Sequence, residues 1–136
     1  MSERSEFRDV ELPVGVDIVV AVIDAARVIG ELREEQVNED TQDPENADSS
    51  DPGAMYDTLK GLIDDLNDDE QAGLIALTWL GRGDREASEW EGLLALARER
   101  NAGRTAATYL VEMKMLGGLL AEGLAAFGIV AEDVPR

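Results

Sequence analysis

The sequence predicts an all-α protein: a compact bundle of five or six helices with a long acidic linker after the first helix. Two observations favour helices. Apolar residues recur at intervals of three and four, and residues that cap helices stand just before these apolar runs. A third observation, a stretch rich in acids, proline and serine with almost no apolar residues, predicts the linker. No segment is typical of a β-strand.

The first helix is expected over residues 14–37. The early part of this segment is rich in valine and isoleucine, so a buried strand is the alternative. Its polar residues are spaced by seven, three, four and three, which places them on one helical face: Asp17, Asp24, Arg27, Glu31 and Glu34. The segment is also longer than an ordinary strand. We therefore predict a helix whose apolar side chains cover most of its circumference.

The linker is predicted over residues 38–53, because a segment of this composition buries too little apolar surface to offset the entropy of ordering it. It lies within the most acidic part of the chain, residues 31–70, which carry fifteen acidic and two basic residues, a net charge of −13. The expected organisation is a polar N-terminal tail (1–13), the apolar helix (14–37), the flexible linker (38–53), a helical core domain (54–129) and a C-terminal tail (130–136).

Capping residues and apolar stripes divide the core domain into helices. Asp51 and Pro52 are typical of a helix start, and an apolar stripe follows: Met55, Leu59, Leu62, Ile63 and Leu66. Asn67 and Glu70 have the spacing of a capping box, so they open the next helix. We expect that helix to stop at residues 81–83, with Gly81 as its left-handed terminus.

Two further helical segments complete the core. The first is capped by Asp84 or by Ser88, which forms a second potential capping box with Glu91, and it stops at residues 101–103. The second begins near Thr105, breaks around residues 116–118 and continues to Gly128.

Composition excludes several kinds of function. The chain has 136 residues, thirty acids against twelve bases, a net charge of −18, and neither cysteine nor histidine. Disulfides, thiolate nucleophiles, imidazole bases and cysteine-bound zinc are therefore impossible. The charge disfavours direct binding to nucleic acid and to anionic membranes. The polar N-terminus is unlike a secretory signal, and no apolar run is long enough for a membrane span, so we expect a cytoplasmic location. We expect no cofactor and no metal.

Residues 81–84 form the first candidate interaction site. Arg82 and Asp84 flank Gly83 beside Trp79, an arrangement that suits a partner or a small anion. The alternative, which we favour, is a helix end followed by a cap. Trp79 and Trp90 are candidate binding anchors, although we expect both to lie in the core.

Arg98, Arg100 and Arg104 form a basic cluster that could bind a phosphate or an acidic partner segment. We favour two other roles for it, pairing with a helix dipole or with the acidic linker. A cluster of acids was considered as a cation site: Asp64, Asp65, Asp68, Asp69 and Glu70. It lacks the spacing of an EF-hand, so solvated helix faces and caps explain it better.

One stretch carries a resemblance to a known family: LIDDLNDDEQAGLIALTWLGRGDREASEWEGLLALARERNAGRTAATYL. It resembles the bacterial family catalogued as domain of unknown function 3775, over about residues 55–129, and the WLGRGD segment at residues 79–84 is its most specific part. The likeness departs over residues 111–117, where this chain reads EMKML in place of a proline-containing break. The resemblance implies a small helical bacterial protein and no particular activity.

Three hypotheses about function follow. The first is a non-enzymatic protein–protein interaction or regulatory module, whose partner is another protein or a second copy in a homodimer formed through residues 14–37. The second is an enzyme that uses carboxylates and Arg82, which would need a concave pocket with shifted acids. The third is an acidic mimic of nucleic acid. We favour the first, because no catalytic motif is present.

Overall fold

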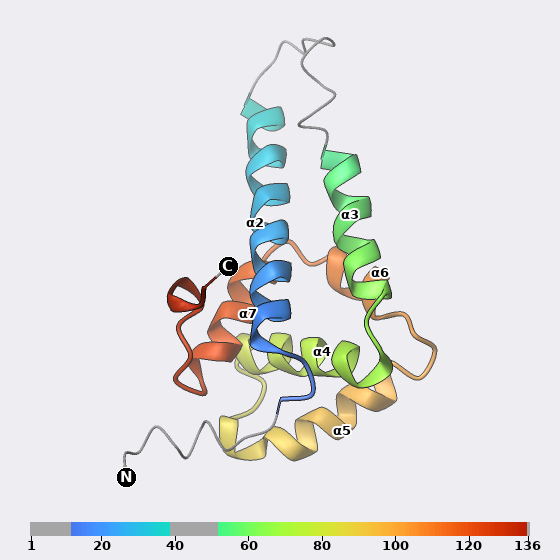
Figure 1. The fold of residues 1–136 in the computed structure, drawn as a ribbon, viewed down its shortest axis with the longest axis vertical. Coiled ribbons are helices and arrows are strands. Elements are labelled where there is room, and N and C mark those ends of the chain that lie inside the picture. Colours follow the sequence, from blue (N-terminus) through green and yellow to red (C-terminus); the bar gives the residue numbers. More distant parts are fainter. Residues whose placement is uncertain (1–11, 39–51, 136) are drawn as a thin grey trace.

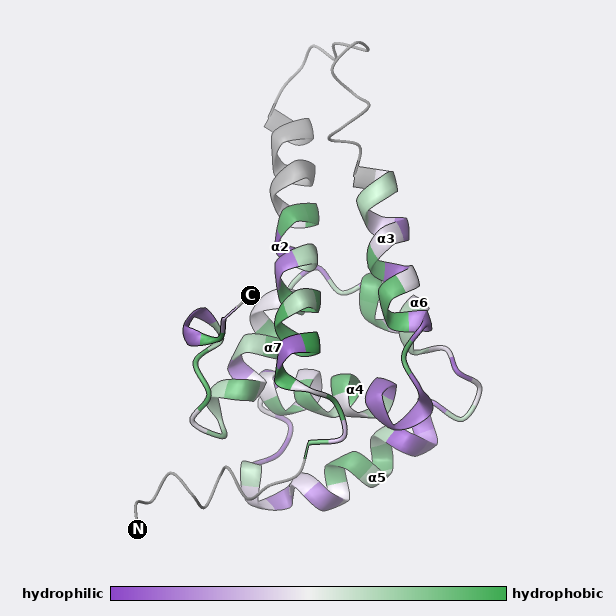
Figure 2. Ribbon diagram, viewed as in Figure 1, coloured by the Kyte–Doolittle hydropathy of each residue, from purple (hydrophilic) through white to green (hydrophobic). Residues whose placement is uncertain are grey.

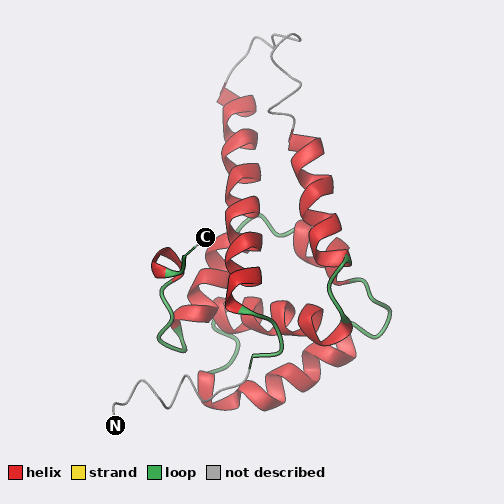
Figure 3. Cartoon of the chain, viewed as in Figure 1, coloured by secondary structure: helices red, strands yellow, loops and turns green. Residues whose placement is uncertain are grey.

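The computed structural model describes residues 12–38 and 52–135. Within them the chain forms six α-helices and two 3₁₀ helices, joined by loops and turns, with no strand (Figure 3). The all-α prediction is confirmed. The helices are α2 (Val16–Asn38), α3 (Pro52–Asp64), α4 (Asp68–Arg82), η2 (Ala87–Glu89), α5 (Trp90–Arg100), α6 (Ala106–Val111), α7 (Leu116–Ala125) and η3 (Ala131–Asp133).

Helix α4 lies at the centre of the fold. All its residues from Gln71 to Thr78 are buried, and it packs against both α5 and α7. Helices α2 and α3 stand side by side and antiparallel above this layer, and α2 packs on α7 while α3 packs on α6 (Figure 1). The core is therefore built around one helix that is covered on several sides.

Helix α2 follows the predicted helix to within two residues at each end. Its apolar side chains meet α7 and α3, and five of them are buried: Val19, Val20, Val22, Ile23 and Ile29. The charged Asp17 and Arg27 lie at the surface, as the polar spacing predicted. Apolar residues line much of α2 and α7 where they face each other (Figure 2). The apolar face of α2 is thus covered within a single chain.

The predicted start of α4 is confirmed. The Asn67 side chain accepts a hydrogen bond from the Glu70 N–H (2.8 Å), and the Asn67 N–H donates to the Glu70 carboxylate (2.9 Å). These two reciprocal bonds satisfy backbone donors that the first turn of a helix otherwise leaves free. The apolar stripe that precedes them packs on the core, with Leu59 and Ile63 fully buried.

The expected helix break at residues 116–118 is wrong. The break lies earlier, between α6 and α7 at residues 112–115, and Gly117 is inside α7. A Cβ atom on Gly117 would lie 3.2 Å from the Ile23 carbonyl oxygen and 3.0 Å from the Arg27 side chain. This glycine therefore allows α7 to approach α2 closely. The last helix also ends earlier than expected, at Ala125.

The expected cap of α5 is also wrong. Neither Asp84 nor Ser88 caps it, because the 3₁₀ helix η2 precedes α5 and the N-cap residue Glu89 makes no side-chain capping bond. The Glu86 N–H instead donates to the Glu89 carboxylate (3.1 Å), two residues before the expected pair of Ser88 and Glu91.

The structure describes only parts of the predicted tails and linker. Most of the predicted N-terminal tail (1–13) and linker (38–53) lies outside the described residues. The C-terminal residues from 130 include η3, whose Ala131 is buried, while Glu132 pairs with Arg27 at 3.5 Å. None of the described helices is long and apolar enough to cross a membrane.

Candidate functional site

Residues 81–84 form the corner at which α4 ends. The glycine in the left-handed conformation is Gly83 (φ 92°), and its N–H donates to the Leu80 carbonyl (3.1 Å). The expectation that Gly81 would be the left-handed terminus is therefore wrong. Gly81 lies inside α4, where a Cβ atom would meet the Leu119 carbonyl oxygen of α7 at 1.9 Å. It is needed for a close helix crossing.

Arg82 and Asp84 form an ion pair across this corner. The Arg82 Nη2 donates to the Asp84 carboxylate at 2.7 Å, and its Nε donates at 3.2 and 3.3 Å. These bonds hold the pKa of Asp84 below its usual value. They also raise the pKa of Arg82, to which Tyr109 adds a smaller contribution. Tyr109 of α6 therefore lies close to the corner.

Tyr109 joins the corner to the end of α5. Its hydroxyl accepts a hydrogen bond from the Trp79 Nε1 (2.9 Å). The Arg100 guanidinium stacks over its ring, with the guanidinium carbon 4.2 Å from the ring centroid, and the Arg100 Nη1 donates to the Thr105 hydroxyl (3.3 Å). Trp79 and Tyr109 are both partly buried, whereas Arg100 is exposed. An aromatic pair is thus flanked by charged groups.

We define the Tyr109 cluster as five residues: Trp79, Arg82, Asp84, Arg100 and Tyr109. Four of them were candidates from the sequence, and the fold brings them together through α4, α5 and α6. Tyr109 itself was missed as a candidate. Its only signal was that it is one of two tyrosines in a chain poor in aromatics.

Trp90, another predicted candidate, lies away from this cluster in the core. It is 3% exposed and packs edge to face against Phe127, with ring centroids 5.3 Å apart and planes at 89°. Its Nε1 has no hydrogen-bond partner among the described residues. This geometry is typical of a core aromatic pair, as was expected for Trp90.

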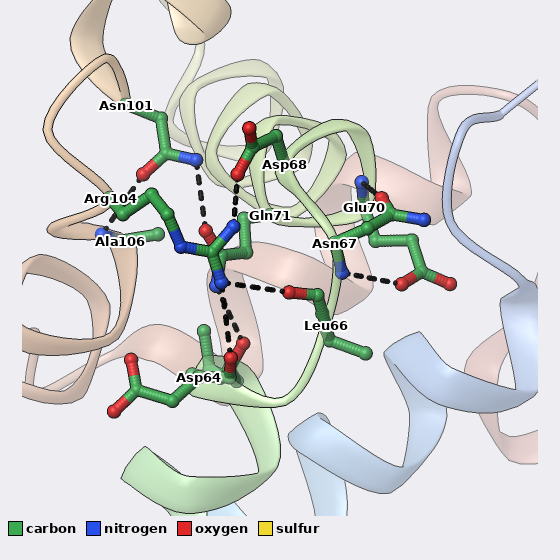
Figure 4. A network of polar contacts seen from close by, with 10 residues as sticks. Asp64, Leu66, Asn67, Asp68, Glu70, Gln71, Asn101, Arg104 and Ala106 are labelled. Atoms are coloured by element: carbon green, nitrogen blue, oxygen red, sulfur yellow. Dashed lines mark hydrogen bonds and ion pairs between the residues drawn. The ribbon is translucent and has the colours of Figure 1, made fainter.

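Arg98 and Arg104 hold the turn between α3 and α4. The Arg98 Nε donates to Asp69 (3.3 Å), and Arg104 pairs with Asp68. The Arg104 Nη2 also donates to the carbonyls of Asp64 (3.3 Å) and Leu66 (3.2 Å), so it satisfies groups at the end of α3 (Figure 4). Their partners are the acidic turn at the start of α4. The linker that was considered as their partner lies largely outside the described residues.

A buried polar network lies directly beneath this turn. The Asn101 Nδ2 donates to the Gln71 side chain (3.0 Å), whose Nε2 donates to the Ile63 carbonyl (2.9 Å). The Ala106 N–H donates to the Asn101 Oδ1 (3.1 Å), which ties α6 to the end of α5 (Figure 4). Because buried polar groups are costly when unpaired, this network fixes how α3, α4 and α6 meet. Sequence reasoning treated Asn101 only as a helix stop.

Four of the five acids considered as a cation site have other partners. Asp64 pairs with Lys60, Asp68 with Arg104, and Asp69 with Arg98, while Glu70 completes the capping box. Among the described residues no three acids gather in an arrangement that would hold a metal ion.

Two hollows lie elsewhere on the fold. The larger, about 230 Å³, lies between α7, α2 and the C-terminal segment, and the smaller, about 20 Å³, lies between α2, α3 and the α6–α7 connection. Neither is lined by a member of the Tyr109 cluster.

The family comparison covers the whole Tyr109 cluster. A family model described as Protein of unknown function (DUF3775) matches residues 56–129. The chain belongs to this family. The DUF3775 match confirms the resemblance to that family over nearly the expected range. It extends from α3 through α7 and leaves α2 outside. Neither a search of curated proteins nor a search of solved structures found a match.

Proposed function

We propose that this DUF3775 protein is a non-enzymatic protein–protein interaction module and that its contact surface is the Tyr109 cluster. One observation carries the proposal: Trp79, Tyr109 and two arginines meet in a single, partly exposed group. Tryptophan, tyrosine and arginine are the residues that most often supply binding energy at protein interfaces. Tryptophan and tyrosine combine a large apolar area with a polar tip, and few of their side-chain torsions have to be ordered on binding.

The charges of the cluster suit binding better than catalysis. An acid or base catalyst works best with a pKa near the operating pH. The pKa of Asp84 is instead lowered by its bonds to Arg82, so this carboxylate stays ionised and neither donates nor accepts a proton readily at neutral pH. The Arg82–Asp84 pair also lines neither of the two hollows described above, whereas small substrates usually bind in concave sites.

Co-purification of partners from the protein's own cell tests the proposal. The test variant is Arg82→Ala combined with Arg100→Ala, two exposed arginines in the cluster. The matched control combines Arg27→Ala with Arg98→Ala, which are exposed, ion-paired arginines outside it. We expect the first variant to lose a partner by at least about tenfold, measured by quantitative mass spectrometry, because hot-spot truncations cost ~2 kcal/mol.

Both variants must keep the circular dichroism spectrum of the wild type. If the cluster variant retains every partner that the control retains, the Tyr109 cluster is not the contact surface and the proposal is wrong.

A homodimer formed through residues 14–37 is a separate proposal about the partner. The apolar face of α2 packs on α7 and α3 of the same chain, so an exchanged dimer would have to unpack this face and rebuild it between two copies. Light scattering over a range of protein concentrations tests it, since an exchanged dimer has twice the mass of a single chain.

A further inference from the structure

We infer that the Tyr109 cluster binds a carboxylate on an acidic segment of the partner protein, and that Arg100 is the residue that holds it. This inference rests on the proposed function, because it names the chemistry that the same surface recognises.

Arg100 is held in place by two contacts that use little of its hydrogen-bonding capacity. Its guanidinium lies 4.2 Å over the centroid of the Tyr109 ring, and one N–H, on Nη1, donates to Thr105. A guanidinium has five N–H donors in a planar fork, and one edge of that fork matches the two oxygens of a carboxylate. The edge formed by Nε and Nη2 makes no hydrogen bond to any described residue. A fixed fork loses little entropy when a carboxylate binds.

Three other arginines in the described part of the chain reach a carboxylate that is distant in sequence. These arginines are Arg27, Arg98 and Arg104. Arg100 pairs with none of the acids in residues 12–30 and 53–135, although the whole chain carries thirty acids. Its position is set by a ring and a hydroxyl instead. The fold therefore leaves this charge available to a carboxylate from outside the described residues.

The Tyr109 hydroxyl offers a second donor next to Arg100. Its oxygen accepts from the Trp79 Nε1, and its own proton has no acceptor among the described residues. A carboxylate bound at the edge of Arg100 has a second oxygen lone pair for such a donor. A single carboxylate also suits the charge of the protein, since a net charge of −18 repels a dianion such as a phosphate more strongly.

The test uses the full chain labelled with ¹⁵N and three short peptides blocked at both ends. One peptide carries a single glutamate, the second has glutamine at that position, and the third has phosphoserine there. The readout is the arginine Nε–H resonance of Arg100 during titration. Arg85 supplies the matched control, because it is exposed and, among the described residues, forms neither a salt bridge nor a ring stack.

We expect the glutamate peptide to shift the Arg100 resonance saturably and the glutamine peptide to leave it unchanged. Arg100→Lys keeps the charge but loses the fork, so binding to this variant, followed by its backbone ¹⁵N–H resonances, should be weaker by about tenfold. Arg85→Lys should leave binding unchanged. Binding should also weaken as salt is added, as expected for an exposed charge pair.

Three results would overturn the inference: no saturable shift, equal loss of binding in the Arg85 and Arg100 variants, or tighter binding of the phosphoserine peptide. Failure here is distinguishable from failure of the proposed function. In one outcome, the double arginine variant loses its cellular partner and no acidic peptide binds. That result would support the Tyr109 cluster as the interaction surface and contradict the inference that Arg100 binds a carboxylate.

Discussion

Replacing Gly81 with alanine tests how closely α4 and α7 cross. A Cβ atom at this position would lie 1.9 Å from the Leu119 carbonyl oxygen and 2.9 Å from the Gly123 backbone nitrogen. Both obstructing groups belong to the backbone of α7, so no side chain can rotate away. Accommodating the methyl group requires the two helices to separate by more than ~1 Å, since non-bonded heavy atoms normally stay about 3.5 Å apart.

The expected cost follows from two opposing effects. Overpacking of a rigid core costs about 1–3 kcal/mol, and the upper end applies where backbone must move. Alanine recovers about 1 kcal/mol through its better helix propensity. We therefore expect Gly81→Ala to lower the free energy of unfolding by ~2 kcal/mol, which lowers the Tm by roughly 8 °C for a chain of this size. Urea unfolding followed by circular dichroism measures the first quantity, and a thermal melt the second.

Two other glycines provide matched controls. Gly118 also lies in a helix, but a Cβ atom there has nothing within 4 Å, so Gly118→Ala should stabilise the fold by about 0.5–1 kcal/mol. Gly83 has open space but a φ of 92°, so Gly83→Ala should cost about 1 kcal/mol through backbone strain alone. If Gly81→Ala is as stable as Gly83→Ala or more so, the close crossing of α4 and α7 is not what requires this glycine.

The remaining predictions concern α2, the corner pair and salt. Val22 is fully buried, so Val22→Asp should lower the free energy of unfolding in urea by ~3 kcal/mol or more. If the protein is a dimer through α2, the same substitution should shift it toward monomer. Val28→Asp, at a position that is 39% exposed, should have neither effect. Pairing with Arg82 lowers the pKa of Asp84 in the folded protein, so this pairing stabilises the fold fully at pH values above 3.8, the ordinary pKa of an aspartate. The stabilisation is lost as the pH falls through the lowered pKa of the folded state. The difference in stability between wild type and Asp84→Asn should thus be about 0.5 kcal/mol at neutral pH, as for an exposed pair, and vanish in strong acid; a difference that grows on acidification would contradict this. With a net charge of −18, the Tm should rise as NaCl is increased from low to near-molar concentration, and a flat or falling curve would indicate that the acids are already neutralised by pairing.

Most of the helices and the N-cap of α4 were predictable because their causes are local. The period of apolar residues determines which face of a helix is buried, and the Asn67–Glu70 pair, three residues apart, caps the same helix that it precedes. The same local rules failed where a glycine was interpreted without its surroundings. Gly81 and Gly117 both lie inside helices, at points where a neighbouring helix comes too close for an unstrained side chain.

The candidate site could be predicted only in part, because its members come from distant positions. Trp79, Arg82 and Arg100 were singled out from the sequence by residue type, yet nothing local indicated that Tyr109 would join them. The same holds for Arg104, whose partners lie more than thirty residues earlier in the turn between α3 and α4.

By itself the sequence determined that this protein is helical, acidic and without thiol or imidazole chemistry, since these properties follow from composition and short spacings. Only the tertiary structure decided which arginines pair with carboxylates and which one stacks on a ring. Such contacts depend on how whole helices pack, and helix packing brings together side chains that no spacing along the chain relates.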